Sequence, residues 1–255
     1  MKQIKEIREQ FSQAGEAELL QLFKEYENDS RSGVRGLIVQ YQKKLDRLTV
    51  ERKRLEQMRI YEHKYEKLGL VCGIDEAGRG PLAGPVVAGA VILPADCEIL
   101  YLNDSKKLTP ARREELFAEI EEKAVAYGIG MASPARIDEI NILQATYEAM
   151  REAISMLRPQ PQVLLNDAVT IPEITFRQVP IIGGDGKSLS IAAASVLAKV
   201  TRDRLMLEYD KIMPEYGFAA HKGYGTAAHI EALKKYGPSP IHRKTFIGHF
   251  VGECE

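Results

Sequence analysis

The segment from Leu70 to Pro94, LVCGIDEAGRGPLAGPVVAGAVILP, decides the fold of this chain. Its first apolar run, Leu70–Ile74, predicts a strand that ends in two adjacent acids, Asp75 and Glu76. A second strand is predicted over Val86–Leu93. Two carboxylates at the end of a buried strand are unfavourable unless a cation neutralises them. Their oxygens suit hard ions, so the pair predicts a site for Mg²⁺ or Mn²⁺.

The turn between these strands contains Gly78, Arg79 and Gly80. Glycines allow a main chain to approach a ligand closely and leave its N–H groups accessible. The guanidinium group of Arg79 offers a planar pair of donors for phosphate. An isolated acidic pair would more simply mark a tight surface hairpin, but the complete string favours a site for metal and phosphate.

The charge of the chain argues against indiscriminate binding to nucleic acid. The 255 residues include 35 Lys and Arg against 36 Asp and Glu, a net charge of −1. A basic footprint could still be local, although each candidate group is typical of a solvated surface. These groups contain Lys106, Lys107, Arg112, Arg113, Lys199, Arg202, Arg204, Lys222, Arg243 and Lys244.

Cysteine usage and hydropathy predict a soluble cytoplasmic protein. Cys72, Cys97 and Cys254 show no paired spacing, which favours reduced thiols over disulfides or a zinc site. No apolar stretch is long enough for a signal core or a membrane span. We therefore expect no interaction with a membrane.

Residues 1–67 differ in composition from the rest of the chain. They contain no Pro and are rich in residues that favour helices. A polar break at 28–33 predicts two helices, the second with apolar residues at helical spacing: Leu37, Tyr41, Leu45, Leu48 and Leu55. The basic excess of this helix would allow contact with nucleic acid or a partner. We favour a solvated helix whose apolar stripe docks on the main domain, which would extend over 68–255.

From residue 68 onward, strand and helix signals alternate. The pairs Thr109–Pro110 and Ser133–Pro134 predict two helix starts. Further strands are expected over 128–131, 163–165 and 178–182, and further helices over 190–213 and 226–236. This pattern predicts the α/β class, with a mixed sheet flanked by helices.

Asp167 and Asp185 also follow strand-like apolar runs. With Asp75 and Glu76 they make four carboxylates that the ends of several strands could bring together. Clustered carboxylates raise one another's pKa values unless cations bind among them. Read alone, Asp167 fits a turn or a cap as well as a metal. Because neighbours on a strand face opposite sides, Asp75 and Glu76 share a site only if the chain bends, which nearby glycines allow.

Six motifs, in this order, resemble those of the type 2 ribonuclease H (ribonuclease HII) family. They are GIDEAGRG from Gly73, DSKKLTPARREELF from Asp104, LLNDA around Asp167, GGDGKSLSIAAASVLAKVTRDRLM from Gly183, HKGYGTAAHIEAL from His221 and PIHRKTF from Pro240. Asn166 stands where the family often has Val, Ile or Ala. The resemblance covers most of the chain.

The resemblance implies the ribonuclease H fold and a metal-dependent endoribonuclease. Its substrates would be the RNA strand of an RNA–DNA hybrid and single ribonucleotides in duplex DNA, the lesions of ribonucleotide excision repair. Cleavage on the 5′ side of a ribonucleotide would leave a 3′-OH and a 5′-phosphate. The family's acidic positions match Asp75, Glu76, Asp167 and Asp185, which would be catalytic and hold two Mg²⁺ or Mn²⁺ ions. We expect a monomer.

The resemblance assigns substrate recognition to the Gly-Arg-Gly turn and to Tyr224. Gly78, Arg79 and Gly80 would read the 2′-OH, which distinguishes RNA from DNA. Tyr224 would stack on the sugar that follows the ribonucleotide. Weaker candidates for contacts to backbone phosphates are Lys106, Lys107 and Lys187.

Two other functions stay open at this point. Type 3 ribonuclease H shares much of the first motif, but its N-terminal domain has strand character, whereas residues 1–67 here are predicted to be helical. The chain could also be a catalytically silent protein that binds hybrid duplexes. The presence of all four acids speaks against that function.

Overall fold

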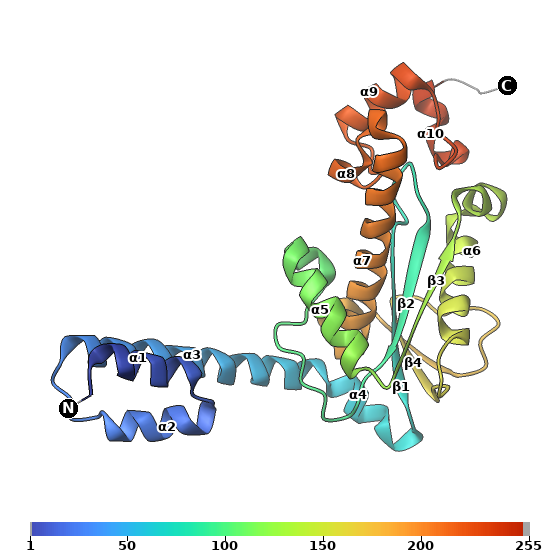
Figure 1. Ribbon diagram of the computed structural model, residues 1–255. Coiled ribbons are helices and arrows are strands. Elements are labelled where there is room, and N and C mark those ends of the chain that lie inside the picture. Colours follow the sequence, from blue (N-terminus) through green and yellow to red (C-terminus); the bar gives the residue numbers. More distant parts are fainter. Residues whose placement is uncertain (1, 252–255) are drawn as a thin grey trace. The chain divides into compact units, whose positions relative to one another are not determined.

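The computed structural model describes residues 2–251 of the chain. Two compact units are present, Met1–Glu56 and Gln57–Glu255 (Figure 1). The domain boundary at residue 67 remains a prediction, and residues 57–67 pack within the larger unit. Cys72 and Cys97 are free and buried, whereas Cys254 lies outside the described residues.

Three helices occur in the smaller unit: α1 (Ile4–Gln13), α2 (Glu16–Glu25) and α3 (Ser32–Met58), which continues into the larger unit. The sequence predicts one helix where α1 and α2 stand. They are separate because the N–H of Gly15 donates to the side chain of Glu18 at 2.8 Å and starts α2.

The apolar stripe of α3 is buried inside the smaller unit. Leu37, Tyr41 and Leu45 pack in one core with Phe11 and Leu19 of α1 and α2. The expectation that this stripe docks on the main domain is therefore wrong for these three residues. They already have partners within the unit.

The larger unit is built on a five-stranded sheet in the order β3-β2-β1-β4-β5. The strands are β1 (Val71–Ala77), β2 (Val86–Ile92), β3 (Ala126–Ala132), β4 (Val163–Asp167) and β5 (Arg177–Ile181). β1, β2 and β3 pair antiparallel, whereas β1, β4 and β5 pair parallel. The prediction of a mixed sheet is confirmed.

Long helices cover both faces of this sheet. α6 (Pro134–Ser155) lies on one face and α7 (Leu189–Ile212) on the other, with α5 (Pro110–Lys123) beside α7 (Figure 1). Thr109 and Ser133 cap α5 and α6, each accepting a hydrogen bond from a backbone N–H three residues later. These contacts confirm the predicted helix starts.

Two glycines allow α7 to lie directly against the strands. A Cβ atom at Gly73 would lie 2.1 Å from the carbonyl carbon of Ser190, and one at Gly89 would lie 2.5 Å from the carbonyl oxygen of Ala194. No side chain fits at either position. The pairing of β1 with β2 runs without interruption from Cys72 to Ala77, past Gly73 and both acids.

Shorter elements complete the larger unit. They are the helices α4 (Ile60–Tyr65), α8 (Phe218–His221), α9 (Ala227–Tyr236) and α10 (Lys244–Val251), and the 3-10 turns η1 (Glu66–Leu68), η2 (Ser105–Lys107), η3 (Gly184–Gly186) and η4 (Pro214–Tyr216). Between residues 2 and 251, no helix is both long and apolar enough to cross a membrane.

Candidate active site

β1 carries Asp75 and Glu76 past the end of its pairing with β4. The ladder between β1 and β4 stops at Ile74, whereas the ladder with β2 continues through both acids. Asp75 pairs with Gly89, which faces α7, so Asp75 faces α7 as well. Alternation points Glu76 to the other face. Because β4 no longer pairs with β1 there, the longer side chain of Glu76 has room to reach the same groove.

Asp75 is almost completely buried, with 4% of its surface exposed. Its Oδ1 accepts a hydrogen bond from the backbone N–H of Glu76 at 2.7 Å, and Ser195 of α7 is a second partner. Burial raises the pKa of Asp75 well above its ordinary value, and the charges of Glu76 and Asp167 raise it further. Positive charge is therefore needed to keep this carboxyl group ionised.

Glu76 lines a cavity of about 270 Å³ together with residues 78–80, Lys106 and Tyr224. Its Oε1 lies 3.3 Å from Nη1 of Arg79, and among the described residues Oε2 is buried without a hydrogen-bond partner. Burial raises the pKa of Glu76, although the charge of Arg79 opposes the shift. A bound cation would satisfy this orphaned oxygen.

Asp167 ends β4, and Asp185 lies in the turn η3 that follows β5. Oδ1 of Asp167 accepts a hydrogen bond from the N–H of Gly184 at 2.7 Å. Burial raises the pKa of Asp185, and the charges of Asp104 and Asp167 add to the effect. Because Asp167 also raises the pKa of the two acids of β1, the four predicted carboxylates share one electrostatic environment.

Asp104 is a fifth carboxylate at this site. It accepts a hydrogen bond from the N–H of Lys106 at 2.9 Å and thereby caps the short turn η2. Its charge contributes to the raised pKa of Asp185. Nothing in the local sequence indicates that Asp104 faces Asp185.

The carboxylates fit a hard divalent cation in their chemistry, since they offer oxygen ligands, one of which, Oε2 of Glu76, is buried without a partner in the described chain. Within residues 2–251, no three acidic, His or Cys side chains are already arranged to hold a metal ion. Exposed cations contact them instead: Arg79 lies beside Glu76, and Nζ of Lys106 lies 3.7 Å from Asp185. Such exposed ion pairs are weak, so the carboxylates can reorient around an ion.

A buried arginine holds the Gly-Arg-Gly turn from the protein side. Arg243, 0% exposed, donates to the carbonyl oxygens of Gly78, Arg79 and Gly84 at 2.5, 2.9 and 3.0 Å. Its pKa falls to about 9, chiefly because of burial. The guanidinium group replaces water as the partner of three carbonyls that would otherwise be unsatisfied.

A second buried arginine, Arg202 of α7, extends this support. It donates to the carbonyl oxygens of Ala83, Pro85 and Lys222, each at 2.9 Å. Gly78 has a φ of 95°, and a Cβ atom there would lie 2.1 Å from Nε of Arg202. Only glycine fits at this position, since both the backbone conformation and the neighbouring guanidinium exclude a side chain.

These contacts decide which way the amides of the turn point. The C=O and N–H of one trans peptide point in opposite directions. Arg243 holds the carbonyls of Gly78 and Arg79 inward, so the N–H groups of Arg79 and Gly80 point outward. Space in front of Gly80 is open, with no atom within 4 Å of its Cβ position. The turn therefore presents main-chain donors to the groove.

The sequence predicts surface positions for Arg202 and Arg243, and this prediction is wrong. Both side chains are completely buried, whereas their neighbours Arg204 and Lys244 are exposed as expected. No local pattern separates the buried cations from the exposed ones. Their role depends on carbonyl groups far away in the sequence.

Tyr224 lies in the lining of the same cavity, with 45% of its surface exposed. Its ring is 5.9 Å from Cζ of Arg202. The loop that contains Tyr224 is linked to the Gly-Arg-Gly turn, because the N–H of Leu82 donates to the carbonyl of Gly223 at 2.8 Å. The predicted recognition residues are thus brought together.

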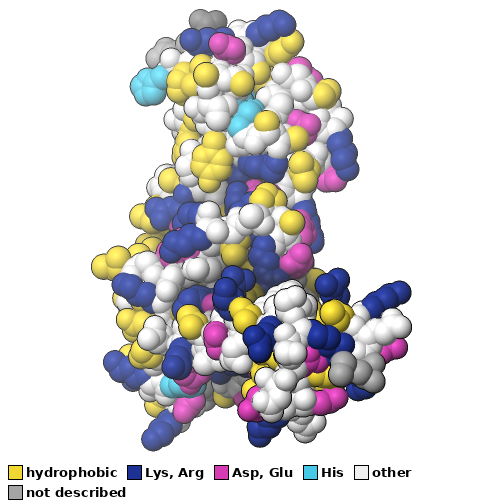
Figure 2. Space-filling model, turned by 90° about the vertical axis from the view of Figure 1, so that its left-hand side faces the viewer, with side chains coloured by type: hydrophobic (Ala, Val, Ile, Leu, Met, Phe, Trp, Pro, Cys, Tyr) yellow, Lys and Arg dark blue, Asp and Glu magenta, His cyan; other side chains and the backbone are white. Residues whose placement is uncertain are grey.

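The three candidate lysines differ in position. Lys106 lines the cavity, Lys107 lies 3.7 Å from Asp104, and Lys187 donates to the carbonyl of Ile182 at 2.7 Å. Lys107 and Lys187 do not line the cavity. On the face shown in Figure 2, Lys and Arg side chains are interspersed with acidic ones, in agreement with the balanced charge of the chain.

Comparison with known proteins places this site in a family. A model described as ribonuclease HII matches residues 72–249, and a model of the ribonuclease HII N-terminal domain matches residues 3–66. A ribonuclease HII of Lachnoclostridium phytofermentans is 59% identical over 244 residues, 96% of this chain and 96% of that protein. The chain belongs to the ribonuclease HII family. Members of this family are metal-dependent endoribonucleases that act on RNA–DNA hybrids.

Solved structures agree with this assignment. Ribonuclease H2 from Pyrococcus horikoshii OT3 is 32% identical, with a TM-score of 0.58 over 69% of this chain and 93% of that one. A ribonuclease HII from Archaeoglobus fulgidus, solved in complex with PCNA, is 30% identical, with a TM-score of 0.57 over 68% and 91%. The ribonuclease H-like fold is confirmed. The match of residues 3–66 to the family's own N-terminal domain, together with their helices, argues against type 3.

Proposed function

We propose that the chain hydrolyses the RNA strand of RNA–DNA hybrids and cleaves on the 5′ side of ribonucleotides embedded in duplex DNA. The products would carry a 3′-OH and a 5′-phosphate, as ribonucleotide excision repair requires. One observation carries this proposal: Asp75 and Glu76, whose pKa values are raised, directly precede the Gly-Arg-Gly turn, and Glu76 lines one cavity together with residues 78–80. The protein acts as a cytoplasmic monomer.

Asp75, Glu76, Asp167 and Asp185 are the catalytic residues in this proposal and would hold two Mg²⁺ or Mn²⁺ ions. When bound, such ions supply an activated water and neutralise charge on the phosphoryl group. Asp75 is the most buried of the four, so its carboxylate would gain most from the positive charge of such ions. Arg79 and Lys106, which contact the carboxylates now, would turn to the phosphates of the substrate.

Recognition of the ribonucleotide falls to Gly78, Arg79 and Gly80. The outward N–H groups of this turn can donate to the 2′-OH, and the open space at Gly80 lets a sugar approach. Tyr224 would stack on the following sugar. Lys107 and Lys187 lie outside the cavity and would serve only the more distant phosphates.

Replacement of Asp75 tests the catalytic assignment. Asp75→Asn keeps the shape of the side chain but removes the charge that a cation needs. With Mn²⁺ or Mg²⁺ present, we expect the variant to lose about a thousandfold or more of its cleavage of a duplex with one ribonucleotide. Asp96→Asn, at an exposed position, is the control and should cleave normally. Wild-type rates for Asp75→Asn would refute the site.

Replacement of Tyr224 tests recognition separately. Tyr224→Ala should reduce cleavage at single ribonucleotides more than it weakens duplex binding, because stacking on one sugar adds little to total affinity. Tyr236→Ala, an exposed tyrosine outside the cavity lining, is the matched control. Equal losses of cleavage and binding would contradict the stacking role.

A catalytically silent protein that binds hybrid duplexes is the second candidate. It predicts duplex binding without cleavage at any Mn²⁺ concentration. The unsatisfied carboxylate oxygen of Glu76 and the raised pKa of Asp75 disfavour it, since a silent binder gains nothing from buried acids.

A further inference from the structure

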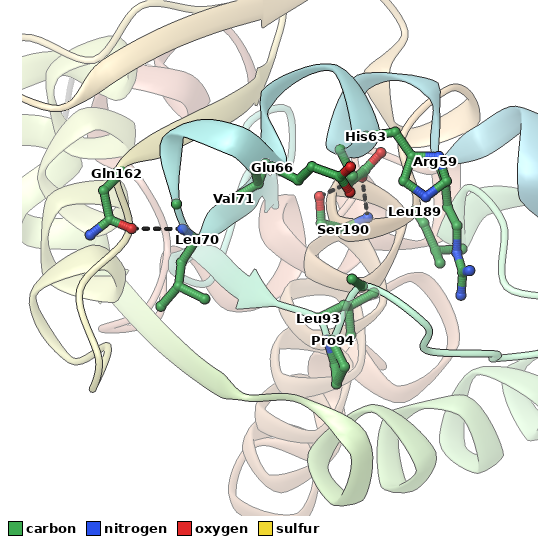
Figure 3. Close-up of a pocket in the computed structure, with 13 residues that line it drawn as sticks. Arg59, His63, Glu66, Leu70, Val71, Leu93, Pro94, Gln162, Leu189 and Ser190 are labelled. Atoms are coloured by element: carbon green, nitrogen blue, oxygen red, sulfur yellow. Dashed lines mark hydrogen bonds between the residues drawn. The ribbon is translucent and has the colours of Figure 1, made fainter.

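The carboxylate of Glu62 ties α4 to the start of α7. Its Oε1 accepts hydrogen bonds from Oγ of Ser188 at 2.5 Å, from N of Ser190 at 2.9 Å and from Oγ of Ser190 at 2.7 Å. Figure 3 shows the two bonds that end on Ser190. Ser188 is also the N-cap of α7, where its Oγ accepts from the N–H of Ile191 at 3.2 Å.

From Ser188 the hydrogen bonds continue into the candidate active site. The N–H of Ser188 donates to the carbonyl of Gly184 at 2.8 Å, and the N–H of Gly184 donates to Oδ1 of Asp167 at 2.7 Å. Asp185 lies in the chain between Gly184 and Ser188. Through Ser188, Glu62 therefore holds the turn that contains one candidate metal ligand and orients another.

Packing around this contact is incomplete, so it depends on the hydrogen bonds. A cavity of about 350 Å³ is lined by Glu62 of α4 and by Val71 and Leu93. Figure 3 shows Val71 and Leu93 in this lining. Tyr61 and Tyr65, on the same helix, pack against a hydrophobic core that includes Val71. The two tyrosines dock α4, and Glu62 fixes the position of the turn.

We propose that Glu62 is a positioning residue for metal binding, acting on Asp167 and Asp185 through Ser188 and Gly184. This inference rests on the proposed function, because it takes both aspartates as ligands of the divalent ions. It assigns a role to residues before Leu68: α4 completes the active site although it lies outside the motifs that resemble the family.

A series at residue 62 tests this role in the full chain. Glu62→Ala should weaken binding of Mn²⁺ to the metal-free protein by about tenfold to a hundredfold, the usual effect of losing a group that orients metal ligands. Calorimetric titration with Mn²⁺ measures this affinity without turnover. The Mn²⁺ concentration for half-maximal cleavage should rise equally, with the maximal rate recovered at high Mn²⁺.

Glu62→Gln is the conservative member of the series. Oε1 accepts all three of these hydrogen bonds, whereas Oε2 has no hydrogen-bond partner among the described residues, so an amide keeps the essential acceptor. We expect Mn²⁺ affinity within about threefold of the wild type. Hydrogen exchange of the amides in residues 183–188 should be faster in metal-free Glu62→Ala and close to wild type in Glu62→Gln.

Glu66→Ala is the matched control, because Glu66 lines the same cavity with an exposed side chain. Its Mn²⁺ affinity should stay at the wild-type value. Equal losses in Glu62→Ala and Glu66→Ala would overturn the inference, and so would wild-type affinity and exchange in Glu62→Ala. If Glu62→Ala does not fold, Ser190→Ala removes one donor without altering α4. A smaller loss of Mn²⁺ affinity there supports the inference, and no loss contradicts it.

Asp75→Asn separates this inference from the proposed function. If Asp75→Asn abolishes cleavage while Glu62→Ala binds Mn²⁺ normally, only the positioning role fails. If Asp75→Asn cleaves at wild-type rates, the proposed function itself fails.

Discussion

The Gly-Arg-Gly turn and the acidic cluster lie side by side, but they are held in opposite ways. The carbonyls of Gly78 and Arg79 in the turn are fixed by Arg243, and those of Ala83 and Pro85, which follow it, by Arg202; both arginines are completely buried. The carboxylates face only exposed cations and include an oxygen with no partner in the described chain. The proposed recognition turn is thus held in place by the protein alone, whereas the proposed catalytic cluster would be completed by bound cations.

This difference has a thermodynamic meaning. Buried carbonyls that receive hydrogen bonds contribute to stability, whereas buried carboxylates without compensating charge reduce it. Binding sites commonly retain such unfavourable arrangements because the bound ligand removes them. Variants that remove a donor to the carbonyls should therefore lower stability, whereas variants that remove a buried carboxylate should raise it.

Loss of Arg243 should have the largest effect on stability. Arg243→Met leaves three buried carbonyls without donors, and we expect a loss of about 3 kcal/mol or more in the free energy of unfolding. Urea denaturation measures it. Arg243→Lys should recover only part of the loss, because an ammonium lacks the planar fork. Lys244→Met, on the exposed neighbour, should change little. Wild-type stability of Arg243→Met would contradict the conclusion that Arg243 stabilises the turn.

A fall in pH should have the second largest effect on stability, through two buried histidines near the loop that contains Tyr224. Nδ1 of His229 lies 2.9 Å from the carbonyl of Tyr224, so it is the donor there, and Nε2 of His229 accepts from Nε2 of His242 at 3.0 Å. Nδ1 of His242 accepts from the N–H of Ser239. Both rings are therefore neutral. Burial lowers the pKa of His229, and it lowers that of His242 to about 4.

The pH dependence follows from the sign of these shifts. The unfolded chain binds protons at histidine below its ordinary pKa of about 6.5, before the folded protein does. Stability should therefore fall by roughly 2–3 kcal/mol as the pH drops from about 6.5 to 4. Urea denaturation across this range measures the loss. His242→Asn should remove much of this loss of stability at low pH. An unchanged dependence of stability on pH in that variant would contradict the role given to the histidines.

Removal of one charge from the catalytic side should raise stability by a smaller amount. Asp75→Asn should stabilise the metal-free protein at pH 7, because the pKa of Asp75 is raised in the folded state and the wild type must keep a buried carboxyl group ionised. The gain should grow as the pH rises above the ordinary carboxyl pKa, since the folded wild type must then ionise a buried group. Thermal unfolding with and without Mn²⁺ checks this, and saturating Mn²⁺ should reverse the order of the two proteins.

Removal of the first compact unit is expected to have the smallest effect, and the quantity to measure is the affinity for Mn²⁺. A chain that begins at Gln57 keeps Glu62 and should bind Mn²⁺ within about twofold of the full chain, whereas one that begins at Leu68 should lose about tenfold. Calorimetry on both chains gives the comparison. Equal affinities for the two truncated chains would show that the segment 57–67 does not act on the metal site.

The sequence predicts the elements of the sheet and the convergence of its acids well, because local patterns encode both. Continuous apolar runs mark the central strands, and Thr109 and Ser133 mark helix starts through contacts only three residues away. The acids follow strand ends, and strands of one sheet end near one another. The assignment of each carboxylate to an ion stays a prediction.

The residues whose roles were not predicted from the sequence have one thing in common: each role depends on groups far away along the chain. Arg202 and Arg243 resemble surface cations until the carbonyls of residues 78–85 are placed against them. Asp104 resembles a turn residue until Asp185 is placed beside it. The break at Gly15 is a local signal and could have been found from the Gly and Glu three residues apart.

The glycines at 73 and 89 make the junction between sheet and α7 mechanically stiff. Side chains ordinarily lie between the backbone of a helix and that of a sheet, and changes of their rotamers accommodate small displacements of the helix. Here peptide groups touch peptide groups, so a shift of Ser190 or Ala194 is transmitted to the strands without damping. The distance between Asp75 and the start of α7 is thereby set by the backbone itself, and thermal repacking of side chains leaves it unchanged.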